Sequence, residues 1–95
     1  MFEWDEVKSS QNLSKRGFDF DYVSMIFDGD IIERVDDRHD YQEERIIALG
    51  EIDTEIYCVV YTWRYKKRRI ISARAANRKE RNDYYRTFNS RHTTP

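Results

Sequence analysis

The stretch that decides the fold is Ile56-Tyr57-Cys58-Val59-Val60-Tyr61-Thr62-Trp63, followed by Arg64-Tyr65-Lys66-Lys67-Arg68-Arg69-Ile70-Ile71-Ser72-Ala73-Arg74. Residues 56–63 are β-branched, aromatic and apolar on both faces, which predicts a strand in the interior of a sheet. Residues 64–67 turn the chain without glycine or proline, and residues 68–73 predict the next strand. Because this hairpin is basic, we expect the working surface of the protein to lie here.

Charge is divided unevenly between the two halves of the chain. Residues 1–44 hold 13 Asp or Glu and 5 Lys or Arg, whereas residues 45–95 hold 5 Asp or Glu and 12 Lys or Arg. Nine basic residues and a single acid, Glu80, lie between Arg64 and Arg81. A protein with net charge -1 can therefore present a positive face that attracts phosphates or acidic partners. The alternative is that the two halves fold face to face and cancel.

Residues typical of helix ends occur both before and after the predicted strands. Asp5 is a good N-cap and Gly17 fits the position after a helix end, which predicts a helix that runs to about Arg16. A second short helix is expected from Asp19 or Asp21 to residues 28–30, and Phe2 and Trp4 read as an extended lead that packs on the core. Asn77 followed by Glu80 is close to a capping box, so a last helix follows.

Three further segments complete the predicted fold: a first strand over residues 31–35, a polar loop over 36–44 and a second strand over 45–52. The expected fold class is α+β: one compact domain over residues 1–88, with two N-terminal helices, a mainly antiparallel sheet of three to four strands and a C-terminal helix. Residues 89–95 carry no apolar side chain and predict a flexible tail.

Composition excludes several classes of protein. The single cysteine, Cys58, permits no intramolecular disulfide, and no stretch approaches the roughly 20 apolar residues that span a bilayer. The N-terminus does not have the pattern of a signal peptide. We therefore expect a cytoplasmic protein with no membrane contact. Two histidines and one cysteine far apart make no zinc site, and no glycine-rich phosphate loop is present, so no metal or other cofactor is expected.

Four motifs in order resemble the BrnT family, the toxin half of a bacterial type II toxin–antitoxin pair. They are Phe2-Glu3-Trp4-Asp5 with Lys8, Asn12 and Lys15-Arg16-Gly17; His39 with Glu43-Glu44-Arg45 and Gly50; Val59-Val60-Tyr61-Thr62 with Arg64, then Arg69-Ile70-Ile71-Ser72-Ala73-Arg74 and Ala76; and Glu80 with Tyr84. Together they span nearly the whole chain. One departure is that Arg16 stands where the family usually has histidine.

The resemblance implies a compact fold related to the RelE-type ribonucleases and a metal-independent endoribonuclease that inhibits translation and growth. It also implies neutralisation by a cognate BrnA-like antitoxin, through which the complex binds operator DNA. The oligomeric state stays open between a homodimer and a toxin–antitoxin hetero-oligomer.

Cleavage without a metal needs a group that takes the proton of the 2′-hydroxyl and cations that hold the phosphate as charge develops. Arginine suits the phosphate role because its planar fork matches phosphate oxygens. The candidate catalytic residues are Arg64, Arg74, His39, Glu44 and Lys15. Arg64 and Arg74 need not be close, because the strand between them spans roughly 20 Å. Glu44 is a candidate base or an ion-pair partner of Arg45 or Arg74.

Four more residues are candidates for RNA binding: Arg69, Ser72, Tyr65 and Arg78. Tyr65, like Trp63, can stack on bases or simply cover the sheet edge. The alternative function is a non-catalytic basic module that docks an acidic protein or a nucleic acid.

Overall fold

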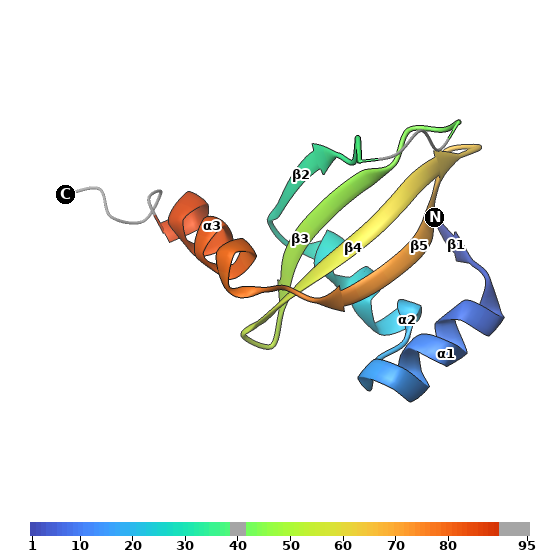
Figure 1. Ribbon diagram of the computed structural model, residues 1–95, viewed down its shortest axis with the longest axis horizontal. Helices are drawn as coiled ribbons and strands as arrows, with labels where there is room; N and C mark the ends of the chain where they lie inside the picture. Colours follow the sequence, from blue (N-terminus) through green and yellow to red (C-terminus); the bar gives the residue numbers. More distant parts are fainter. Residues whose placement is uncertain (39–41, 90–95) are drawn as a thin grey trace.

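A computed structural model describes residues 1–38 and 42–89. Its elements in chain order are β1 (Phe2–Trp4), α1 (Glu6–Arg16), α2 (Phe20–Val23), η1 (Ser24–Asp28), β2 (Ile31–Val35), β3 (Ile46–Ile52), β4 (Glu55–Arg64), β5 (Lys67–Ala75) and α3 (Arg78–Asn89). The strands form one five-stranded sheet in the order β1-β5-β4-β3-β2 (Figure 1). The α+β class is confirmed, whereas the expected count of three to four strands was wrong.

The additional strand is β1, which we expected to be only an extended lead. It pairs in parallel with β5, and Glu3 lies opposite Arg69. The other pairings, β2 with β3, β3 with β4 and β4 with β5, are antiparallel. A three-residue segment that pairs with a strand more than sixty residues away leaves no local pattern in the sequence, which explains the error.

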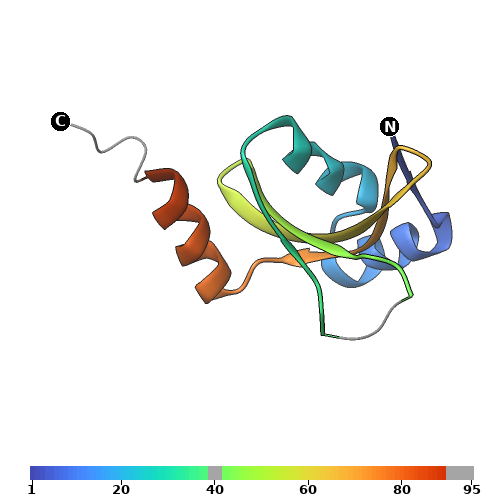
Figure 2. The same ribbon diagram turned by 90° about the horizontal axis from the view of Figure 1, so that it is seen from above.

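Helices α2 and η1 lie against one face of the sheet, whereas α3 lies beyond one end of it (Figure 2). Phe20, Val23 and Ile26 of α2 and η1 pack with Val59 and Tyr61 in the core on one face. On the other face, the residues that pack together are Ile47, Leu49, Ile56, Cys58, Val60, Ala76 and Tyr84. The interior position predicted for β4 is therefore confirmed: residues 56–62 are all buried.

The first helix follows its sequence signals closely. Asp5 Oδ1 accepts hydrogen bonds from the backbone N–H groups of Val7 and Lys8, and Gly17 adopts φ +89°, so the predicted N-cap and helix end are confirmed. The second helix is shorter than expected. Regular α-helix covers only Phe20–Val23, and the chain continues as the 3₁₀ helix η1.

The basic hairpin closes with a tight two-residue turn. Tyr65 and Lys66 both have positive φ, 51° and 68°, which is the geometry of a type I′ turn without its usual glycine or asparagine. Further along, the register between β4 and β5 shifts at Val60 and Tyr61, so Val60 pairs with Ser72 while Tyr61 pairs with Ile70. Ile71 is the extra residue of this β-bulge.

Helix α3 begins with a complete capping box. Asn77 Oδ1 accepts the Glu80 N–H at 2.8 Å, and Glu80 Oε1 accepts the Asn77 N–H at 2.9 Å. The Tyr84 hydroxyl donates to the Asp30 carbonyl oxygen at 2.9 Å, which ties the helix to the start of β2.

Asn89 is the last residue of α3, and residues 90–95 of the predicted tail lie outside the described part of the chain. None of the helices in residues 1–38 and 42–89 has the length and apolar character of a bilayer span.

Candidate nucleic-acid interface

The hairpin register places four candidate side chains on one face of the sheet. Thr62 pairs with Arg69, Val60 with Ser72 and Cys58 with Arg74, while Arg64 pairs with Lys67. Directly paired residues share a face, and Val60 and Cys58 belong to the core on the α3 side. We call the set Arg64, Arg69, Ser72 and Arg74 the strand-arginine face.

Arg64 and Arg74 lie at opposite ends of this face. Arg64 faces the first residue of β5, and Arg74 follows that residue seven positions later. At about 3.3 Å per residue this is roughly 20 Å, so a single phosphate cannot contact both side chains without large movement. One end of the face holds the hairpin turn, and the other holds the start of α3.

Arg74 is held by an ion pair at the end of the sheet next to α3. Its Nη1 and Nη2 donate to Glu80 Oε1 and Oε2 at 2.7 and 2.9 Å, a bidentate pair. Glu80 is 8% exposed, and its pKa is lowered chiefly by the Arg74 hydrogen bonds. Glu80 is therefore a carboxylate with both oxygens occupied, and the expected alternative of a Glu44–Arg74 pair was wrong.

The other two strand arginines also have carboxylate partners. Arg69 Nη1 donates to Glu3 Oε2 at 3.0 Å, across the parallel pairing of β1 with β5. Arg64 Nη2 lies 3.6 Å from Glu43 Oε1, and both side chains are partly exposed. Each of these three arginines is therefore partly neutralised by an acid from another element or loop of the chain.

Two further arginines, which were not among the candidates from the sequence, lie on or near β2. Arg34 is part of that strand, and Arg38 follows it. Arg34 pairs with Ile47 of the α3-side core, is exposed and makes no ion pair with any described residue. Arg38 donates to both oxygens of the buried Asp36, at 2.8 and 2.9 Å. Their signal in the sequence is weak, because both lie in the acidic half of the chain. Arg34 also borders a groove of about 340 Å³ between the sheet and α3, which Ile32, Ile47 and Leu49 line together with charged residues.

Two of the candidate proton carriers, Glu44 and Lys15, lie in the described part of the chain, just before β3 and in α1 respectively. The Glu44 side chain is exposed, and only its backbone oxygen is used, as acceptor for the Thr62 hydroxyl at 2.7 Å. His39 lies outside the described residues. Cys58 is buried, and burial raises the pKa of its thiol, so it stays protonated at neutral pH.

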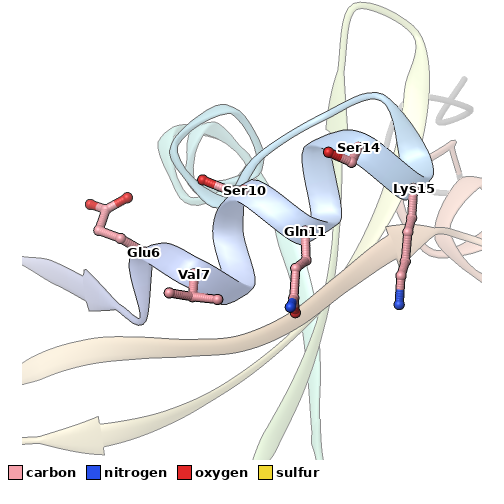
Figure 3. Close-up of a pocket in the computed structure, with 6 residues that line it drawn as sticks. All are labelled: Glu6, Val7, Ser10, Gln11, Ser14 and Lys15. Atoms are coloured by element: carbon pink, nitrogen blue, oxygen red, sulfur yellow. The ribbon is translucent and has the colours of Figure 1, made fainter.

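Lys15 and Ser72, in contrast, line the same groove between α1 and β5. The groove measures about 240 Å³ and is lined by Lys8, Gln11, Asn12, Lys15, Arg16, Phe20, Ile71 and Ser72. We call it the α1 groove. A second hollow, of about 430 Å³, follows α1 and is drawn in Figure 3. Gln11 and Lys15 line this hollow as well and extend from α1 in the same direction, while Glu6 lies at the start of the helix.

The aromatic residues of the hairpin separate into two roles. Tyr65 is 92% exposed in the turn and is accessible to a base. Trp63 packs edge-to-face with Tyr61, with 5.8 Å between the ring centroids. The Arg68 guanidinium lies 4.7 Å from the centre of the Trp63 ring and 4.4 Å from that of Phe27. Trp63 therefore serves the opposite face, on the side of η1. Arg78 is exposed at the first turn of α3.

A metal site finds no support in the part of the chain that the structure describes. No group of three His, Cys, Asp or Glu side chains there is arranged to hold an ion. What the described residues do offer is cations and hydrogen-bond donors on and beside one face of the sheet. That combination suits a polyanion such as single-stranded RNA.

Comparison with known proteins identifies a family but no individual relative. A comparison with curated proteins returns no match. A family model described as the ribonuclease toxin BrnT of type II toxin–antitoxin systems matches residues 4–80, which covers α1, all of β2 to β5 and the start of α3. The chain therefore belongs to the BrnT family of ribonuclease toxins of type II toxin–antitoxin systems.

Proposed function

We propose that this protein is a metal-independent endoribonuclease whose cleavage of RNA inhibits translation and growth. The observation that carries the proposal is the hairpin register, which places Arg64, Arg69, Ser72 and Arg74 together on one face of the sheet. Guanidinium groups aligned along a strand suit the successive phosphates of an RNA chain. Membership of the BrnT family supports ribonuclease activity. We also propose that the fold is related to that of the RelE-type ribonucleases.

The proposed reaction is attack of the 2′-hydroxyl on the adjacent phosphate. A base takes the hydroxyl proton, arginine holds the phosphate as its charge develops, and an acid protonates the leaving 5′-oxygen. Glu80 is a poor base because Arg74 and Asn77 already occupy its oxygens. The remaining candidate proton carriers are Glu44, Lys15 and His39.

The test is incubation of the purified protein with RNA in excess EDTA. We expect cleavage to persist in the chelator and to fall at least tenfold for Arg64→Ala, because Arg64 has only a weak partner at 3.6 Å and is available to phosphate. Lys66→Ala is the matched control in the same turn and should cleave at the wild-type rate. Loss of all cleavage in EDTA would contradict the metal-independent mechanism.

The alternative, a non-catalytic binding module, draws on one specific observation. Arg64, Arg69 and Arg74 all have carboxylate partners, so an RNA strand must compete with Glu43, Glu3 and Glu80. RNA that stays intact in the presence or absence of Mg²⁺, with measurable binding, would establish this alternative.

A BrnA-like antitoxin is the proposed partner, and operator DNA would be bound only through it. We propose that it covers the hairpin with acidic side chains and an apolar anchor beside the exposed Tyr65. Arg64→Glu should weaken the complex, whether it is a hetero-oligomer or contains a toxin homodimer, because like charges then meet at the interface. Unchanged affinity in a titration would place the interface elsewhere.

A further inference from the structure

The charged side chains that line the α1 groove are all positive. Lys8, Gln11, Asn12 and Lys15 recur at the i, i+3, i+4 and i+7 positions of α1 and so lie on one side of the helix. Ile71 and Ser72 of β5, at the bulge, form the opposite wall. Three cations line the groove, and no carboxylate does.

These cations have no partners among the described residues. Lys8, Lys15 and Arg16 make no ion pair there, although Arg64, Arg69 and Arg74 each make one. All three side chains are exposed, so each head group can move to meet a ligand. Three like charges around a space of about 240 Å³ repel one another, and an anion placed between them relieves this repulsion.

The surrounding structure favours positive charge at this place. Lys15 and Arg16 lie in the last turn of α1, where the helix dipole stabilises cations. Asn12 Nδ2 donates to the Phe18 carbonyl oxygen at 2.9 Å, and Ser9 Oγ accepts the Phe20 N–H at 2.9 Å. These two bonds fix the chain that follows α1, so the groove has a defined floor before any ligand binds.

Ser72 connects the α1 groove with the strand-arginine face. It lines the groove, and its pairing with Val60 places it on the same face as Arg69, three residues earlier on β5. The two positions are about 10 Å apart along the strand. A linear polyanion that lies against Arg69 can therefore continue past Ser72 to the three unpaired cations.

We propose that the α1 groove is a phosphate-binding subsite for the backbone of single-stranded RNA, with Lys8, Lys15 and Arg16 as its cations and Ser72 and Gln11 as hydrogen-bond donors. The inference rests on the proposed function. We infer further that the strongest hold on the RNA backbone lies beside α1, because no carboxylate within residues 1–38 and 42–89 has to be displaced from these cations. An acidic protein segment is the competing occupant, and the experiment separates the two.

The experiment measures binding of a 2′-O-methyl RNA oligonucleotide, which cannot be cleaved by 2′-hydroxyl attack, by fluorescence anisotropy over a range of salt concentrations. For single strands, log K falls with log salt by about 0.7 per phosphate contact. Lys8→Gln should therefore reduce the slope by about 0.7, and the double variant Lys8→Gln with Arg16→Gln by about 1.4. Lys79→Gln on α3, equally a lysine on an exposed helix surface, is the matched control and should leave the slope unchanged.

Two results would overturn the subsite: an unchanged slope in the double variant, or an equal loss in Lys79→Gln. Loss of affinity for poly-glutamate without loss for the oligonucleotide would also overturn it and would assign the groove to an acidic protein. Failure of the proposed function looks different, because the wild-type protein would leave ordinary RNA intact while the slopes still changed as stated. Thermal unfolding of each variant checks the fold, which these exposed side chains should not affect.

Discussion

The strand-arginine face and the α1 groove carry cations in very different states. Arg69 and Arg74 donate to Glu3 and Glu80 at 2.7 to 3.0 Å, whereas Lys8, Lys15 and Arg16 have no carboxylate partner among the described residues. The first group therefore stabilises the fold and holds its shape. The second group keeps its charge available for a ligand. Density of positive charge along a sequence does not by itself show where a polyanion binds.

The largest effect should follow from breaking the Arg74–Glu80 pair. Arg74→Ala leaves Glu80 as a largely buried carboxylate that has lost two charge-assisted hydrogen bonds. Because Arg74 is partly exposed, we expect a loss of about 1–2 kcal/mol in the free energy of unfolding. Urea denaturation measures this quantity. Lys8→Gln, the corresponding change in the groove, should leave it unchanged, and an equal loss in both variants would remove the contrast.

The same pair predicts how stability depends on pH. The pKa of Glu80 is lowered in the folded protein, mainly by Arg74, relative to an unfolded value of about 4.3. Its stabilisation is therefore present above about pH 4.3 and is lost as the pH falls through the lower folded pKa. Glu80→Gln should abolish this part of the decline in acid. A wild-type and a variant curve of the same shape between pH 5 and 2 would show that the pair contributes nothing.

Removing a carboxylate should convert a structural arginine into a binding one. In Glu3→Gln the charge partner of Arg69 is lost, so the guanidinium becomes available to RNA. We expect affinity for the 2′-O-methyl oligonucleotide to rise about threefold at moderate salt, with a steeper salt dependence. Glu55→Gln, which removes an exposed acid at the start of β4 outside both the strand-arginine face and the α1 groove, serves as the control for the change in net charge. An equal rise in both variants would mean that only the overall charge matters.

The smallest effect is expected from Arg16→His, which makes one cation of the groove titratable. Unperturbed histidine has a pKa of about 6.5, so the variant keeps the positive charge at pH 5.5 and loses most of it at pH 7.5. Oligonucleotide affinity should match that of the wild type at the lower pH and fall about two- to threefold relative to it at the higher pH. A pH-independent ratio between the two proteins would indicate that residue 16 does not contact the RNA.

Local signals predicted much of the fold. Asp5 and Gly17 define α1 because a cap and a left-handed residue act within one turn, and Asn77 with Glu80 defines the start of α3 in the same way. The apolar run of β4 indicated its burial directly. The pairing of β1 with β5 was missed because three residues carry no period and the partner is distant. The tight turn at Tyr65 was unclear because neither central residue is the usual glycine or asparagine.

The candidate site was less predictable, and the reason is electrostatic. The sequence indicated that Arg64 and Arg74 need not be close, and the register places them at opposite ends of the strand-arginine face. What it did not indicate is that Glu43, Glu3 and Glu80 reach the three strand arginines from a loop, from β1 and from α3. Such pairings depend on the tertiary fold. Lys15 and Ser72 were chosen for separate roles, and only the fold brings both to the α1 groove.

The most direct test of where RNA is held is a map of NMR chemical shift changes as the 2′-O-methyl oligonucleotide is added to the wild-type protein. We expect the largest backbone amide changes on α1 between Lys8 and Arg16 and on Ile71 and Ser72, with smaller changes at Arg69. Changes confined to the hairpin turn and α3, with α1 unaffected, would contradict it.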